Sequence, residues 1–258
     1  MKHYYTSGEA RQQLDMHVGA FYYLIEIGKI KKITPPGKKR GFYSKHQIDR
    51  LAKERLKCVT GEEEPGTIFM TATQDDIYEE YELAALMLNG SAGYGVPSYK
   101  AWLGKNPDTN FIVRDQGRLV AFMHVLPVEQ KTINRWMKGE IREWEISAVD
   151  VLPYTPGSSV ECIIMSMATI SDVDKWKRHQ YGLRLIRGFL HFLYDLAEQD
   201  ITITRFYASS TTPEGIAILR RARFEERAQV GKRVVFELNP ITSHTHLAKA
   251  YSVMRNNR

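Results

Sequence analysis

Two groups of cationic side chains are the residues of this 258-residue sequence best suited to chemistry. One surrounds a Pro-Pro-Gly turn, and the other stands just before an apolar helical segment. They are Lys31, Lys32, Lys38, Lys39 and Arg40, and Lys177, Arg178 and Arg184. Cationic side chains bind phosphates, and unpaired amides at a helix start favour an anion. Both groups are candidate anion sites, and a solvated basic surface is the alternative for each.

The two cysteines, Cys58 and Cys162, are too few for a structural zinc site, and no metal is expected. They are typical of reduced thiols in a cytoplasmic protein. Cys162 is expected to be a small buried hydrophobe rather than a nucleophile, because no His-Asp pair stands near it in the sequence.

The charge of the chain is unevenly distributed. Residues 1–60 hold 13 Lys/Arg against 5 Asp/Glu, a net charge of +8, whereas residues 61–258 carry −2. This asymmetry predicts a basic module that binds a polyanion, double-stranded DNA, joined to a near-neutral module with another task. No apolar run approaches the roughly 18 residues of a membrane span, and no signal peptide is visible. We therefore expect a cytoplasmic protein without a membrane partner.

Segment 1–57 is expected to form helix, turn, helix, hairpin and helix. Thr6 and Glu9 predict a capping box for the first helix, and Gly28 predicts the end of the second. Ser44 and Gln47 predict a second capping box that opens the last helix. A polar stretch with Gly and Pro, residues 58–66, is expected to be a linker.

The residues of this first segment resemble the MerR-like and excisionase-like winged helix-turn-helix families. The resemblance lies in residues 7–10, 22–30, 35–37 and 43–44. It implies that the second helix enters the major groove and that the hairpin is a wing on the DNA backbone. The DNA contacts would then be His17, Tyr22, Tyr23, Lys31, Lys32, Lys38, Lys39 and Arg40, although Tyr22 or Tyr23 can instead belong to the core. A homodimer stays open, because no heptad run for a coiled coil is present.

Segment 67–240 is expected to be α/β (α+β), with a mixed sheet flanked by helices, before a tail at 241–258. Alternation predicts strands, and the 3.6-residue period predicts helices. The expected strands are 111–115, 118–126, 143–151, 160–170, 201–207 and 234–238, and the expected helices are 77–88, 180–199 and 213–223.

This order is similar to that of the GNAT acyltransferases, and residues 110–125, 165–170 and 213–224 resemble parts of that fold. The resemblance implies acetyl-CoA as co-substrate and an amine acceptor of unknown identity. The loop that holds the pyrophosphate would be Lys177–Gly182, in which Gln180 replaces a family glycine. The cofactor contacts would be Met167, Thr169, Lys177, Arg178, His179, Gln180, Tyr181, Gly182 and Leu183.

The resemblance also implies an acid and a base. The family's tyrosine acid is replaced by Leu219, and Tyr207 is the candidate substitute. Glu161 on the central strand is the candidate general base, and Glu145 on a neighbouring strand is a second one. The alternative function is a transcription regulator whose GNAT-like module is a non-catalytic sensor or interaction module.

Overall fold

The computed structural model describes residues 3–14, 16, 18–26, 28–34, 41–60, 66–87 and 95–241, with the backbone alone at 20 and 53–60. The chain divides into two compact units, Met1–Glu63 and Glu64–Arg258, called unit 1 and unit 2 below. The division falls within residues 58–66, the expected linker, of which 58–60 are helical and 61–65 lie outside the described residues. Among the described helices, none combines the length and the apolar character needed to cross a membrane.

Unit 1 comprises β1 (Tyr4–Thr6), α1 (Ser7–Leu14), α2 (Val18–Glu26), β2 (Phe42–Ser44) and α3 (Lys45–Thr60). The first capping box is confirmed: the Thr6 amide donates to Glu9 Oε2 at 2.7 Å, and the Glu9 amide donates to Thr6 Oγ1 at 3.3 Å. Gly28 follows α2 with φ +75°, the left-handed conformation of a helix end.

The core of unit 1 forms where α1, α2 and α3 meet the β1–β2 pair. Phe21 of α2 packs edge-on against Tyr43 of β2, with the ring centroids 4.8 Å apart. The second capping box is only half formed. The Gln47 amide reaches Ser44 Oγ at 3.5 Å, but the Gln47 side chain contacts the backbone of Lys29 and Lys31. Gln47 therefore ties the segment after α2 to α3.

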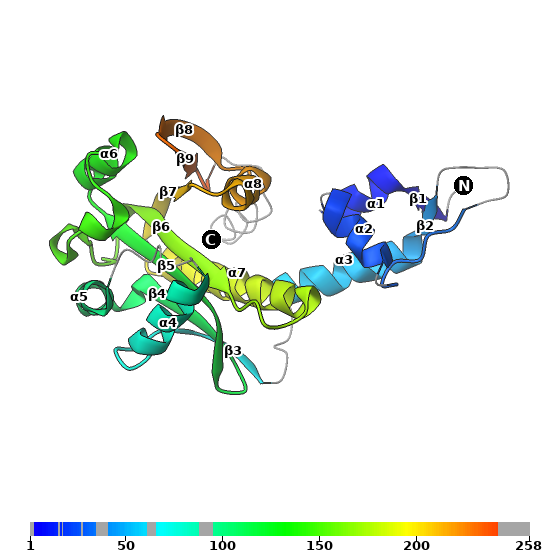
Figure 1. Ribbon diagram of the computed structural model, residues 1–258, viewed down its shortest axis with the longest axis horizontal. Helices are drawn as coiled ribbons and strands as arrows, with labels where there is room; N and C mark the ends of the chain where they lie inside the picture. The colour runs from blue at the N-terminus through cyan, green and yellow to red at the C-terminus, as the bar shows by residue number, and fades with distance from the viewer. Residues whose placement is uncertain are drawn as a thin grey trace. The chain divides into compact units, whose positions relative to one another are not determined.

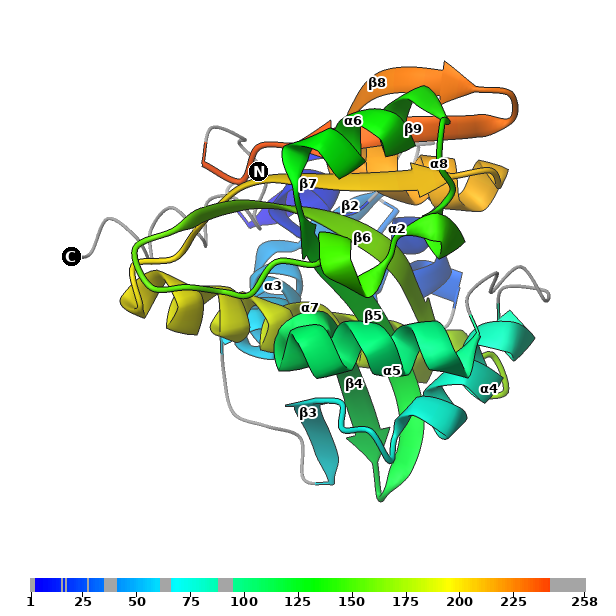
Figure 2. The same cartoon turned by 90° about the vertical axis from the view of Figure 1, so that its left-hand side faces the viewer.

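Unit 2 is a seven-stranded mixed sheet flanked by helices, which confirms the expected fold class (Figures 1 and 2). Its strands are β3 (Thr67–Thr71), β4 (Asn110–Asp115), β5 (Arg118–Val128), β6 (Ser159–Thr169), β7 (Thr202–Ser210), β8 (Glu225–Val230) and β9 (Arg233–Leu238). Its α-helices are α4 (Ile77–Met87), α5 (Val96–Lys105), α6 (Gln130–Lys138), α7 (Lys175–Glu198) and α8 (Pro213–Arg221). The strand order is β3-β4-β5-β6-β7-β9-β8.

The β6–β7 pair is the one parallel pairing among the described strands of unit 2. Its ladder ends at Ile164 and Ala208, although β6 continues to Thr169 and β7 to Ser210. A register shift in the β5–β6 ladder leaves Met165 as the extra residue of β6 just beyond that end. The two strands therefore part at the centre of the sheet, and this place is called the β6–β7 opening below.

In unit 1, the described residues keep only one bridge of the expected hairpin, between Ile33 and Phe42, and β2 pairs instead with β1.

Two expected elements of unit 2 differ from the structure. The strand expected at 143–151 is wrong, since the chain forms two short 3₁₀ helices, η2 (Glu143–Glu145) and η3 (Ala148–Asp150), each with a capping box. The helix expected from Gln180 begins five residues earlier, at Lys175. Hydrogen bonds from polar side chains to nearby backbone amides explain both differences. At 143–151 they stabilise 3₁₀ turns in place of the strand that the alternation favours, and at Asp174 they allow α7 to begin earlier.

The two faces of the sheet are covered by different helices. Phe111 of β4 packs against Phe189 and Phe192 of α7, with centroids 5.1 and 4.8 Å apart. A Cβ added at Gly188 of α7 would lie only 2.0 Å from the Phe69 ring, so only glycine lets α7 approach β3 this closely. The other face buries a second core that includes Trp102 of α5, Trp136 of α6, Ile163 and Tyr207.

Candidate functional site

The first turn of α7 is already capped by its own chain. Asp174 Oδ1 accepts hydrogen bonds from the amides of Trp176 at 2.8 Å and Lys177 at 3.0 Å. The Arg178 amide donates to the Asp174 carbonyl, as it does inside a helix. Residues 177–182 are therefore helical, which corrects the expectation that they form a loop before the helix.

Side chains of α7 hold the β4–β5 hairpin instead of standing open to a ligand. Tyr181 Oη donates to Asp115 Oδ2 at 2.6 Å, and Lys177 Nζ lies 3.0 Å from the same oxygen. These two contacts, Tyr181 first, lower the pKa of Asp115 below its usual range. Arg118 of β5 pairs with Asp172 at 2.6 Å. The structure thus brings Lys177 and Tyr181 together, but around a carboxylate.

The other expected cofactor residues share the same end of α7 and β6. Arg178 and His179 are exposed, and Gln180 and Leu183 are half-buried. Gly182 lies inside the helix, and a Cβ there would be 3.8 Å from Thr169 Cγ2. Met167 of β6 is 42% exposed beside the opening. Their role in binding acetyl-CoA stays a prediction.

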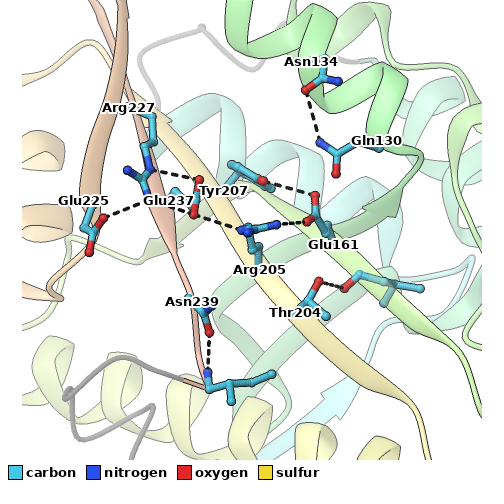
Figure 3. A network of polar contacts seen from close by, with 12 residues as sticks. Gln130, Asn134, Glu161, Thr204, Arg205, Tyr207, Glu225, Arg227, Glu237 and Asn239 are labelled. Carbon is cyan, nitrogen blue, oxygen red and sulfur yellow. Dashed lines mark hydrogen bonds and ion pairs between the residues drawn. The ribbon is translucent and has the colours of Figure 1, made fainter.

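Glu161 and Tyr207 are brought together, from the neighbouring strands β6 and β7 (Figure 3). Tyr207 Oη donates to Glu161 Oε2 at 3.2 Å, and Arg205 Nη1 donates to Glu161 Oε1 at 2.7 Å. Arg205 also reaches Glu237 of β9 at 3.2 Å, and Arg227 of β8 pairs with Glu237 and Glu225. We call this row across β6, β7, β9 and β8 the ion-pair ladder.

Tyr207 is held in its protonated form. Burial raises the pKa of Tyr207 to about 12, and the nearby carboxylates of Glu161 and Glu237 act in the same direction. Tyr207 lies opposite Ile163, one residue before the β6–β7 ladder ends. A retained phenol proton therefore stands next to the opening.

Glu145 does not join this group. It lies in η2, not on a strand, and its Oε2 accepts the Arg142 amide at 2.7 Å as part of a capping box. Its neighbour Glu143 is the more buried carboxylate: Oε1 accepts from Trp136 Nε1, Ser209 Oγ and Arg233 Nη1, each at 3.0 Å. Burial raises the pKa of Glu143, but a hydrogen bond from its own backbone and the Arg233 charge outweigh that effect and lower it.

A buried polar chain crosses the centre of the sheet and was missed from the sequence. His124 Nε2 lies 2.5 Å from Glu80 Oε1, and His124 Nδ1 lies 2.9 Å from Ser166 Oγ. Asn110 Nδ2 donates to Glu80 Oε2 at 3.0 Å. The sequence signal that could have revealed it is a histidine and a serine inside the apolar runs of β5 and β6, since buried polar side chains need partners.

The expected DNA contacts are described only in part. Tyr22 is 50% exposed and Tyr23 is half-buried, so Tyr22 is the better placed to contact a partner. Lys31 and Lys32 are exposed. His17, Lys38, Lys39 and Arg40 lie outside the described residues.

Cys162 is fully buried, as expected, and burial raises the pKa of its thiol to about 12. No cluster of three or more His, Cys, Asp or Glu side chains suited to a metal ion occurs in the part of the chain that the structure describes.

No family model and no curated protein sequence matches this chain. Three solved structures illustrate what this chain is similar to. Ard1 from Thermoplasma volcanium has 12% identity over 67% of this chain and 97% of its own, with a TM-score of 0.44. The loading GNATL domain of CurA from Lyngbya majuscula has 10% identity, coverages of 67% and 97% and a TM-score of 0.48. The PaiA N-acetyltransferase from Thermoplasma acidophilum, solved with coenzyme A, has 8% identity, coverages of 67% and 98% and a TM-score of 0.42. At these values the likeness is one of chain path and carries no inference about activity.

Proposed function

We propose that unit 2 transfers an acetyl group from acetyl-CoA to an amine acceptor, in a cytoplasmic protein whose unit 1 binds DNA. The observation that carries the transfer is the β6–β7 opening, with Glu161 and Tyr207 in contact beside it. Parting parallel strands offer backbone groups to an extended amide-containing arm, and a carboxylate with a phenol supplies a base and an acid.

The fit of acetyl-CoA is best argued at the start of α7. Lys175, Lys177, Arg178 and His179 lie in its first two turns, where the helix dipole disfavours cations, so an anion there would relieve a local cost. These residues would hold the pyrophosphate, provided that Asp174 released the amides it now caps. When bound, acetyl-CoA would supply the acyl group as a thioester.

The chain's own residues would then move protons. Glu161 would take up the proton of the attacking amine, while Arg205 holds the carboxylate in place. Tyr207 would hold its proton for the leaving group, since its pKa of about 12 keeps it protonated at neutral pH. The ladder joins Glu161, Glu225 and Glu237 to two arginines, Arg205 and Arg227, and this surplus of acid favours a cationic amine.

The test is release of free coenzyme A from acetyl-CoA with a panel of primary amines. Glu161→Gln and Tyr207→Phe should each lower the rate, by about 10²–10⁴-fold for the loss of a general base. Glu226→Gln, on the exposed β8 surface, is the matched control and should leave the rate unchanged. A well-folded wild type that neither releases coenzyme A nor gains thermal stability with acetyl-CoA would exclude the transfer.

The second candidate for unit 2 is a non-catalytic ligand sensor or interaction module. The Asp174 cap and the Lys177–Asp115 pair favour it, because both occupy groups that a pyrophosphate needs. Under this alternative, acetyl-CoA gives no thermal shift in wild type. An Asp174→Ala variant that also gives none would leave the sensor as the function of unit 2.

DNA binding by unit 1 is proposed from its charge and from the exposure of Tyr22, Lys31 and Lys32. Fluorescence anisotropy with duplex DNA should show log affinity falling linearly with log salt concentration. Lys31→Ala together with Lys32→Ala should weaken binding on all sequences alike and reduce the slope by about 1.8. Lys131→Ala in unit 2, 73% exposed, is the control. Equal binding by the double variant would exclude these phosphate contacts.

A further inference from the structure

Three polar side chains from three separate elements form one continuous hydrogen-bonded line inside unit 2. Glu80 lies on α4, His124 on β5 and Ser166 on β6. Glu80 and His124 are completely buried, whereas Ser166 keeps 9% exposure and is the end nearest to solvent. The line therefore has a closed acidic end at Glu80, and its most exposed member is Ser166 at the other end.

The position of His124 is fixed from several sides. Its ring packs edge-on against Tyr99, with centroids 4.5 Å apart, and lies 5.1 Å from the Phe122 ring. Glu80, its acidic partner, is itself held by Asn110. A buried carboxylate without partners destabilises a protein by several kcal/mol. The contacts of Glu80 with Asn110 and His124 offset that penalty and orient the imidazole.

The proton positions follow from the partners of the ring. If Nε2–H donates to the Glu80 carboxylate, Nδ1 is left as an acceptor for the Ser166 hydroxyl. A hydroxyl bonded to an imidazole whose other nitrogen is oriented by a carboxylate is the arrangement that activates serine as a nucleophile.

Ser166 also has the right location. It lies two residues past Ile164, where the β6–β7 ladder ends, and thus on the part of β6 that borders the opening. His124 is paired with Ser166 directly across the β5–β6 ladder, so the hydroxyl and its base belong to the rigid centre of the sheet. A reactive group on rigid strands keeps its geometry better than one on a loop.

We infer that Ser166 is an acyl-accepting nucleophile that hydrolyses esters or thioesters of small acyl groups. Ser166 Oγ forms a C–O bond to the acyl carbon while its proton passes to His124 Nδ1, and the bond to the leaving alcohol or thiol breaks as that proton is returned to it. Water then attacks the acyl-serine: its proton passes to His124, a new C–O bond forms, and the serine is released with the proton. Because Ser166 is only 9% exposed, we expect short acyl groups to react faster than long ones.

This activity needs neither coenzyme A nor an amine, so its test is independent of the proposed transfer. The full chain is incubated with p-nitrophenyl acetate, and nitrophenol release and protein mass are followed. Wild type should gain one acetyl group, mapped to Ser166 by peptide mass spectrometry. p-Nitrophenyl decanoate should react at least tenfold more slowly, because the buried hydroxyl excludes a long chain.

The variants separate chemistry from folding. Ser166→Ala should abolish the adduct, and Ser166→Cys should restore an acyl adduct as a thioester. Ser159→Ala, at the exposed start of β6, is the matched control and should acylate like wild type. Glu80→Gln should slow acylation by about a thousandfold or more, because an amide donates to Nε2 and forces the wrong tautomer.

The outcomes decide between the ideas. Acetylation of Ser166 without any amine acetylation from acetyl-CoA would support Ser166 as a nucleophile. The same result would reject only the proposed transfer to an amine. Folded wild type that neither releases nitrophenol faster than Ser166→Ala nor carries an adduct on Ser166 would overturn the nucleophile whatever the transfer assay gives. If Glu80→Gln does not fold, the Ser166→Ala and Ser166→Cys pair still carries the test.

Discussion

Two polar networks of unit 2 each hold a glutamate carboxylate, but they lie in opposite surroundings. The buried line of Glu80, His124 and Ser166 crosses the centre of the sheet with at most 9% exposure. The ion-pair ladder includes side chains that are 44% exposed at Arg205, 43% at Arg227 and 71% at Glu225. Both include a residue of β6, so one strand takes part in a network that is sensitive to the loss of a partner and in one that is less sensitive.

The difference shows that exposure sets the energy of a polar contact. In the ladder, water solvates the Arg205 and Arg227 guanidinium groups, so each pair adds less to stability than a fully buried pair does. In the buried line, any missing partner leaves a polar group without water, so each contact matters to folding. Four substitutions test this comparison, from the largest expected effect to the smallest.

His124→Ala should have the largest effect, because it leaves the buried Glu80 carboxylate with only the Asn110 contact. We expect the free energy of unfolding to fall by about 3–5 kcal/mol. Denaturant titration measures it. His191→Ala, on the exposed surface of α7, is the matched control, with an expected change within about 0.5 kcal/mol. A similar loss for both variants would break the comparison.

Arg233→Met tests an intermediate case, since Arg233 is 3% and Glu143 14% exposed. The loss of this hydrogen bond to a charged group should cost about 1.5–3 kcal/mol. Because the pKa of Glu143 is lowered in the folded state, its stabilisation is present above its usual pKa of 4.5 and is lost as the pH falls through the folded value. Unfolding measured at pH 7 and in acid should show this pH dependence weakened in Arg233→Met. An unchanged acid profile would contradict the assignment.

Arg227→Ala removes the cation at the β8 end of the ladder. Its cost should be only about 0.2–1 kcal/mol, and high salt should reduce it further because exposed pairs are screened. Chemical denaturation with urea, with and without added salt, measures both. A loss as large as that of Arg233→Met would show that the ladder is not the less sensitive network.

Tyr207→Phe should have the smallest effect, because it removes one neutral donor and leaves Arg205 on the Glu161 carboxylate. The folded pKa of about 12 lies above the usual 10.0, so the stabilisation is complete below pH 10 and is lost as the pH rises through 12. The tyrosinate absorbance of wild type minus Tyr207→Phe should therefore titrate near 12. A difference that titrates near 10 would show that Tyr207 is solvated.

The hairpin of unit 2 was predictable because its signals are local. Its strands are apolar runs, and the turn at Gln116 and Gly117 has φ of +50° and +85°, conformations that a glycine-containing turn favours. Alternation failed at 143–151, since the capping boxes closed by Glu145 and Asp150 favour 3₁₀ turns there. The helices α5 and α6 were not predicted, although Trp102 and Trp136 anchor them in the core.

Only one part of the candidate site was predictable from the sequence, the pair of residues on the neighbouring strands β6 and β7. Glu161 and Tyr207 were named from the sequence and meet in the structure. Glu80, His124 and Ser166 are separated by more than 40 positions at each contact and show no shared motif. Their meeting depends on strand pairing and on the packing of α4, which no local pattern reveals.

The contact between Gly188 and Phe69 places a limit on how this chain can change by descent. A side chain at position 188 and an aromatic ring at position 69 cannot occupy the same space, because even a Cβ would overlap the ring. Any related sequence that keeps α7 against β3 and has a side chain at position 188 must therefore have a smaller residue than phenylalanine at position 69. In an alignment of relatives, an aromatic residue at position 69 should occur only together with glycine at position 188.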